Sequence, residues 1–139
     1  MGIGVVCRDG ASAVLWGLPI VRTQNWDPNM AEAVAILDGL QEAERRGYRN
    51  VEIESDCLLV VEALKSKKVG RSITSLVLED NLSLSNSFHS VFWLHTNRIN
   101  NCVAHDLAHP VSRVVGRLVW AEVLPPSANA PVLFDISLL

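Results

Sequence analysis

The sequence predicts an α/β domain in which a mixed sheet is flanked by helices. Two observations carry this prediction: short apolar runs that end in turn residues, and longer segments whose apolar residues recur every three or four positions. The 139 residues are 49% hydrophobic, which is enough for the core of about one domain.

The chain is expected to begin with a β-hairpin. Residues 3–7 form an apolar run that ends at Asp9 and Gly10, and Asp-Gly is a strong hairpin-turn signal. Residues 13–17 are the expected returning strand. Residues 17–28 have no clear period and are expected to connect the hairpin to the next element.

A long amphipathic helix is expected next, because apolar residues share one helical face from about Asn29 to Ala43. Arg45 and Arg46 in its last turn suit the negative end of the helix dipole, and Gly47 suits the cap that follows. Residues 51–55 are then expected as a strand.

Two further helices are expected before the next strand. The first covers residues 57–65, and Asp56 can serve as its N-cap. A basic loop follows, and Ser72 can cap the second helix, which bears Ile73, Leu76, Val77 and, more weakly, Leu84.

The remaining elements are a strand, a helix and a tail. Residues 91–94 are continuously apolar, as in a strand covered on both faces. A helix is expected to begin near Asn101, and Pro110 should end or kink it. Prolines 125, 126 and 131 predict an extended tail. We therefore expect one domain over residues 1–139, with a core at about residues 2–121 and a tail of residues 122–139.

Composition limits the class of protein. The formal net charge is −3, so any binding of nucleic acid would have to rest on local patches. No stretch approaches the roughly 20 apolar residues of a membrane span, and no secretory signal is visible. Cys7, Cys57 and Cys102 lack the spacing of a metal site and are expected to be buried thiols in a reducing compartment. We expect an intracellular protein, cytoplasmic or nuclear, that is not secreted and contacts no membrane.

Short motifs lie on three of these elements. Glu32 stands in an Ala-Glu-Ala motif that opens the first helix, Asp56 follows Glu-Ser at the end of a strand, and Asn101 opens the last helix before Ala104, Leu107 and Ala108. Together these segments resemble the RNase H-like family, particularly the plant branch found in retroelement-derived reverse-transcriptase-like proteins. The resemblance covers residues 2 to about 138.

The resemblance implies an RNase H-like mixed sheet with flanking helices, nucleic-acid binding and hydrolysis of RNA–DNA hybrids. The family holds two Mg²⁺ or Mn²⁺ ions with four acids: an Asp on strand one, a Glu on the first helix, an Asp ending strand four and an Asp starting the last helix. Glu32 and Asp56 match the second and third of these. Each also has an ordinary interpretation: Glu32 suits the dipole of a first helical turn, and Asp56 suits an N-cap.

Two of the four positions depart from the family pattern. His105 occupies the place of the fourth acid, and Asp106 lies one residue further, about 100° around a helix. A neutral His ligates Zn²⁺ or Mn²⁺ better than Mg²⁺, or it is a polar residue without a ligand. The chain begins after the family's first strand and its Asp, so an N-terminally truncated domain that lacks the first, central strand is expected.

The missing strand has a structural consequence. Its two neighbours would each lose a partner, and unpaired buried backbone groups cost about 1–3 kcal/mol each. We therefore expect the chain to close the gap by a new pairing, to recruit a strand from another chain, or to stay loosely folded.

Several cationic and polar residues are candidates for contact with nucleic acid. His95 at a strand end and Arg98 in the following loop are candidate phosphate contacts, and His95 is also a candidate proton shuttle. Lys67 and Lys68 lie in the basic loop and can contact a phosphate backbone, or simply face solvent after a helix.

The expected function is RNase H type-1-like: binding of an RNA–DNA hybrid and metal-dependent hydrolysis that is impaired, because two of the four carboxylates are missing. The alternative is a catalytically inactive module that binds nucleic acid or another protein.

Overall fold

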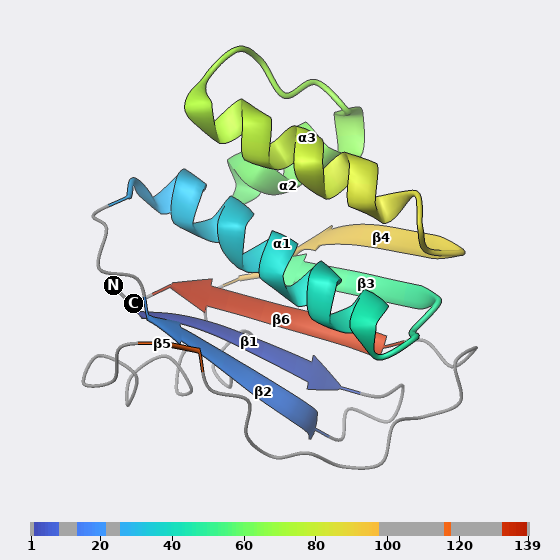
Figure 1. Ribbon diagram of the computed structural model, residues 1–139. Coiled ribbons are helices and arrows are strands. Elements are labelled where there is room, and N and C mark those ends of the chain that lie inside the picture. The colour runs from blue at the N-terminus through green and yellow to red at the C-terminus, as the bar shows by residue number, and fades with distance from the viewer. Residues whose placement is uncertain (1, 9–13, 22–25, 98–115, 118–131, 139) are drawn as a thin grey trace.

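In the computed structural model, a six-stranded sheet is covered on one face by three helices (Figure 1). The structure describes residues 2–8, 14–21, 26–97, 116–117 and 132–138. The elements are, in chain order, β1 (Gly2–Arg8), β2 (Val14–Val21), α1 (Pro28–Arg45), β3 (Asn50–Ser55), α2 (Leu58–Ser66), α3 (Ile73–Ser85), β4 (Ser90–His95), β5 (Gly116–Arg117) and β6 (Val132–Leu138).

The strands lie in the order β4-β3-β6-β1-β2-β5. The expected hairpin is present, with β1 and β2 antiparallel and Ile3 opposite Ile20. Strands β3 and β4 pair in parallel, with Ser55 opposite His95 at their carboxyl ends. The predicted mixed sheet with flanking helices is therefore confirmed.

Strand β6 closes the sheet between β1 and β3. It is antiparallel to β1, with Val6 opposite Asp135, and parallel to β3, with Glu54 opposite Asp135. Of the three outcomes expected for the missing central strand, the structure shows a new pairing within the chain. No strand from another chain is needed at this position, because β6 pairs with both neighbours.

The position of β6 also corrects the boundary between core and tail. Residues 132–138 are extended, as the prolines before them predict, but they lie in the middle of the sheet rather than outside a core of residues 2–121. No local pattern around residues 132–138 indicates this central position, since strand pairing between residues so far apart depends on the whole fold.

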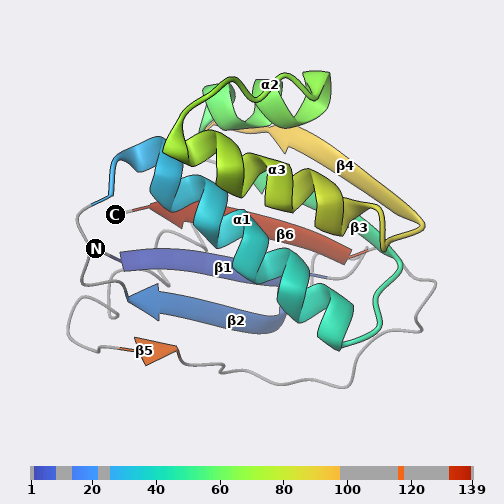
Figure 2. The ribbon, with the colours of Figure 1, turned by 45° about the horizontal axis from the view of Figure 1, so that its top comes forward.

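The helices cover the sheet mainly through α1. Figure 2 shows α1 running along β6 and β1, with α3 beside it and α2 nearer to β4. Ile36 and Leu40 of α1, Ile53 of β3 and Leu64 of α2 are among the largest fully buried side chains. Burial of each such side chain contributes about 1.5–3 kcal/mol.

Both ends of α1 are set by local chemistry. The carboxylate of Asp27 accepts hydrogen bonds from the backbone N–H groups of Asn29, at 2.9 Å, and Met30, at 3.1 Å, so it is the N-cap. Pro28 follows at the first helical position, where its missing N–H costs nothing. Gly47 ends the helix with a φ of +79°, as the sequence predicts.

One expectation about the later elements is wrong. Strand β4 lies at an edge of the sheet, and its Phe92 is 57% exposed, so this strand is not covered on both faces. Helix α3 begins after the predicted cap, Ser72. It buries Leu78 and Asn81 and leaves Ile73 and Leu76 74% and 62% exposed, while Val77 and Leu84 pack partly against the core. A hydrogen-bonded Asn can be buried as well as an aliphatic side chain, so the buried face of α3 is not set by its apolar residues alone. Within the described residues, no helix has the length and apolar character to cross a bilayer.

Candidate active site

Glu32 lies in the second turn of α1, on the face that packs against the sheet. It was expected in the first turn, but the helix already begins at Pro28. Its side chain is 0% exposed, among the largest fully buried side chains of the protein. A buried carboxyl without a cationic partner is costly, so its surroundings matter.

Ser55, the last residue of β3, is the hydrogen-bond partner of this carboxyl. Its Oγ–H donates to Glu32 Oε1, and the same Oγ accepts the backbone N–H of Cys57 at 3.0 Å. The end of β3 and the start of α2 are thereby tied to α1. The other carboxyl oxygen, Glu32 Oε2, is buried and has no hydrogen-bond partner among the described residues. An unsatisfied buried oxygen of this kind needs an explanation, and an ion that is bound during function is one.

The carboxyl of Glu32 holds its proton to an unusually high pH. Burial raises its pKa from 4.5 to about 8; the hydrogen bond from Ser55 lowers it and the negative charge of Asp56 raises it. Glu32 is therefore neutral at pH 7 unless a cation replaces its proton. A strongly shifted titratable group beside a second carboxylate is typical of a functional site.

Asp56 lies between the end of β3 and the start of α2. Asp56 was also expected to cap α2. The N-cap is instead Cys57, and the side chain of Cys57 makes no capping hydrogen bond. Asp56 directly follows Ser55, whose hydroxyl donates to Glu32, and its negative charge raises the pKa of Glu32, so the two carboxylates lie in the same part of the fold. The Glu32 and Asp56 motifs therefore lie in the same part of the fold, and the motif that begins at Asn101 lies outside the described residues.

Cys57 adds no metal-binding thiolate to this pair. Burial raises its pKa, and Sγ–H donates to Asn29 Oδ1 at 3.1 Å, so the group remains a thiol at neutral pH. The donor set described here is thus two carboxylates, hard oxygen ligands of the kind that Mg²⁺ and Mn²⁺ prefer. Among the side chains described, no group of three His, Cys, Asp or Glu could hold a metal ion. Glu32 and Asp56 fit part of such a site.

Two residues that support the site were missed in the sequence. Ser55 is part of the Glu-Ser-Asp motif, so alternation along β3 could have placed it on the buried face with Val51 and Ile53. Asn81 of α3 is fully buried, and its Nδ2 donates to the carbonyls of Ala33, at 2.9 Å, and Val77, at 3.0 Å. These hydrogen bonds hold α3 against α1 one residue from Glu32. A polar residue within a helix is common, so the sequence pattern did not indicate this role of Asn81.

The other candidates are spread over the molecule. His95 ends β4 opposite Ser55 and is exposed, and the backbone N–H of Thr96 donates to Ser55 O at 3.0 Å, so His95 lies at the same edge of the sheet as the carboxylates. Arg98 and His105 lie outside the described residues. Lys67 and Lys68 are exposed beyond the far end of α2, about 13 Å along that nine-residue helix from its start.

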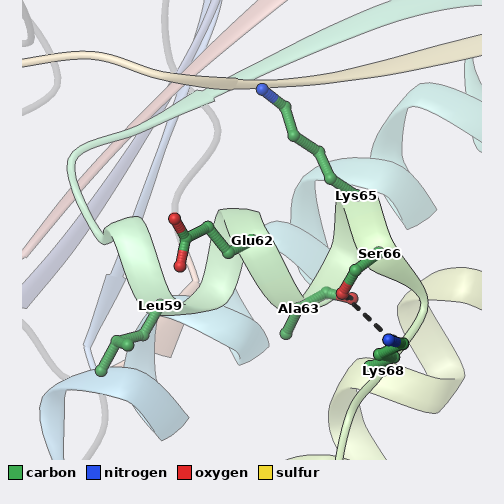
Figure 3. A pocket seen from close by; sticks show the side chains of 6 residues that line it. All are labelled: Leu59, Glu62, Ala63, Lys65, Ser66 and Lys68. Atoms are coloured by element: carbon green, nitrogen blue, oxygen red, sulfur yellow. Dashed lines mark hydrogen bonds between the residues drawn. The ribbon is translucent and has the colours of Figure 1, made fainter.

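Lys68 also borders a shallow hollow of about 660 Å³ on α2. Figure 3 shows its lining side chains along α2 and just past its C-terminal end, where the backbone N–H of Lys68 donates to Ser66 Oγ at 3.4 Å. The residues that line it are Leu59, Glu62, Ala63, Lys65, Ser66 and Lys68. This hollow is separate from the carboxylate pair.

The arrangement of a mixed sheet, helices on one face, and a helix glutamate meeting a strand-end aspartate defines an RNase H-like domain. A family model described as reverse transcriptase-like matches residues 1–111, and the chain belongs to that family. The family expectation is confirmed. The plant and retroelement origin and the truncation remain predictions.

Solved structures share this fold at low sequence identity. RNase H1 from the halophilic archaeon Halobacterium salinarum is 20% identical, with a TM-score of 0.73 over 80% of this chain and 84% of that one. An N-terminal RNase H domain from Mycobacterium tuberculosis, solved as a fusion with maltose-binding protein, is 18% identical, with a TM-score of 0.67 over 78% of this chain and 89% of that one. No curated protein matches the sequence.

Proposed function

We propose that this chain is an RNase H type-1-like domain that binds RNA–DNA hybrids and hydrolyses their RNA strand at a site centred on Glu32 and Asp56. The observation that carries the proposal is the buried Glu32 carboxyl, with one unpartnered oxygen, beside the carboxylate of Asp56. Both acids stand on motifs of the family to which the chain belongs.

Glu32 and Asp56 would hold a divalent cation, Mg²⁺ or Mn²⁺, which supplies water activation and stabilisation of the departing oxygen in phosphodiester hydrolysis. Ser55 keeps Glu32 Oε1 fixed by its hydrogen bond, so Oε2 is the oxygen available to a ligand. Glu32 releases its proton when it binds the cation, since its pKa of about 8 keeps it protonated at pH 7. His105, where the family has an Asp, would favour Mn²⁺ over Mg²⁺.

Contact with the nucleic acid would come from local cations, because the net charge of −3 gives no general attraction. Lys67 and Lys68 are exposed at the far end of α2 and would contact phosphates along the duplex. His95 ends β4 at the same edge of the sheet as Ser55 and would contact phosphates near the cleavage point or move a proton. Arg98, three residues further in the sequence, would also contact phosphates.

The whole of residues 1–139 forms this one domain in our proposal, derived from a plant retroelement and working in the cytoplasm or nucleus. The second candidate function is a module that binds nucleic acid, or another protein, without hydrolysis. The observation in its favour is that only two family carboxylates meet among the side chains described.

The decisive experiment measures binding and cleavage of a labelled RNA–DNA hybrid in Mn²⁺ and in Mg²⁺. We expect hybrid binding, slow cleavage in Mn²⁺, little or none in Mg²⁺, and loss of cleavage in Glu32→Gln with binding retained. The matched control is Glu62→Gln, an exposed glutamate on α2. Binding without cleavage in either metal would favour the second candidate, and robust Mg²⁺ turnover would refute the impaired site.

A further inference from the structure

Asp56 lies between two residues that both hydrogen-bond to α1. Before it, Ser55 Oγ–H donates to Glu32 Oε1. After it, Cys57 Sγ–H donates to Asn29 Oδ1 at 3.1 Å. Asn29 and Glu32 are one helical turn apart, so they lie on the same side of α1. The segment that carries Asp56 is therefore attached to α1 on both sides of this carboxylate.

The link through Cys57 joins groups that are themselves held in place. Asn29 lies in the first turn of α1, where its backbone N–H donates to the N-cap carboxylate of Asp27 at 2.9 Å. Cys57 is the N-cap residue of α2, and its side chain makes no capping hydrogen bond within that helix. Its backbone N–H donates to Ser55 Oγ at 3.0 Å, and this same hydroxyl donates to Glu32. The two links are thus joined, and they bring the start of α1, the end of β3 and the start of α2 into one hydrogen-bonded unit.

The thiol of Cys57 keeps its proton at neutral pH and can therefore serve as the donor of this link. Burial is the largest cause that raises its pKa, and the negative charges of Glu32 and Asp56 raise it further. A thiol is a weak hydrogen-bond donor, so the link directs the course of the chain more than it strengthens the fold.

We infer that Cys57 and Asn29 are positioning residues of this site: their hydrogen bond fixes the segment that carries Asp56, so that the carboxylates of Asp56 and Glu32 can bind one cation. The inference rests on the proposed function, since it concerns the cation of the same site. It gives a role to Cys57, which adds no metal-binding thiolate. Groups that orient metal ligands typically change metal affinity or activity by about 10–100-fold when they are removed.

The test is Mn²⁺ binding to the full chain, measured by calorimetry and by the electron paramagnetic resonance spectrum of the bound ion, together with cleavage of the labelled hybrid in Mn²⁺. Cys57→Ala and Asn29→Ala each remove one partner of the link, the double variant removes both, and Cys57→Ser keeps a donor. The matched control is Ser87→Ala, which removes a side-chain hydrogen bond outside the site, from Ser87 Oγ–H to the carbonyl of Leu84 at 2.7 Å.

We expect Cys57→Ala or Asn29→Ala to weaken Mn²⁺ binding about tenfold, at the lower end of the range because the donor is weak. The double variant should bind no more weakly than either single variant, because all three lack the same bond. The spectrum of the bound ion should change in these variants, and in Cys57→Ala kcat should fall while KM for the hybrid stays nearly constant. Cys57→Ser should restore most of the affinity, and Ser87→Ala should bind Mn²⁺ like the wild type.

A purely structural bond would give a different result. Cys57→Ala and Asn29→Ala would then lower the unfolding temperature but leave the Mn²⁺ affinity, the spectrum and kcat as in the wild type, so the inference would fail and the proposed function would stand. Additive losses of affinity in the double variant would also refute the inference, because the two residues would then act separately. If the wild type binds no Mn²⁺, both fail.

Discussion

Replacing Glu32 with Gln should stabilise the protein in a strongly pH-dependent way. The folded-state pKa of Glu32 is raised from 4.5 to about 8, chiefly by burial. The folded chain therefore keeps a proton that the unfolded chain loses above pH 4.5. The stability that the Glu32 proton contributes is fully present below pH 4.5. It falls as the pH rises towards 8, where this contribution has been lost.

The size of this effect follows from the shift. Each pKa unit corresponds to 1.36 kcal/mol, so the wild type loses about 4 kcal/mol between pH 4.5 and pH 7.5 and about 5 kcal/mol in total. Glutamine has the shape of the protonated carboxyl and does not titrate, and its oxygen can accept the Ser55 hydrogen bond. We expect Glu32→Gln to unfold on the order of 10 °C above the wild type at pH 7.5 and at nearly the same temperature at pH 4.5.

Calorimetric or circular-dichroism unfolding from pH 4.5 to 8.5, in chelator, measures this difference. Glu42→Gln is the matched control, a buried glutamate on the same helix whose pKa is lowered to about 2 by hydrogen bonds from Arg45 and Arg46 and by their charges. Its substitution should destabilise the protein above pH 4.5, the opposite sign. An unfolding temperature of Glu32→Gln equal to or below that of the wild type at pH 7.5 would refute the reasoning.

Three further predictions concern the site and the sheet. Mn²⁺ affinity should rise about tenfold per pH unit between pH 6 and pH 8, with one proton released per ion, and a flat pH profile in titrations would exclude Glu32 as the ligand. Ser55→Ala removes the hydrogen bond that lowers the pKa of Glu32, so the pH at which stability stops falling should move upward in the same unfolding series. Deleting residues 132–139 exposes both inner edges of the sheet and should abolish the cooperative unfolding transition, whereas an unchanged transition would show that β6 is dispensable.

Local elements were predictable from the sequence because local chemistry forms them. The Asp-Gly turn gives the hairpin, the three-and-four period gives α1, and Gly47 ends it with a left-handed backbone. The meeting of Glu32 and Asp56 was predictable only through the family motifs, since nothing local relates a helix to a strand that follows it in the chain.

The rest depends on tertiary packing. The burial of Asn81 depends on a carbonyl of α1, and the exposure of Phe92 depends on β4 lying at the sheet edge. The pairing of β6 with β1 joins residues as distant as Ile3 and Leu138. Neither strand contains a residue from which its pairing with the other could be predicted.

The central place of β6 sets the order in which the protein can fold. Residues 28–95 contain α1, β3, α2, α3 and β4, whose contacts with one another span fewer residues than the pairing of β6 with β1, so this segment can organise before the sheet closes. The β1–β2 hairpin can also form by itself, but it joins the rest of the sheet only through β6. Until residues 132–138 have been synthesised, β1 and β3 each have an unpaired edge. The unpaired backbone groups of such an edge can pair with strands of other chains and cause aggregation. Folding during translation is therefore completed late, and the growing chain depends on protection of those two edges.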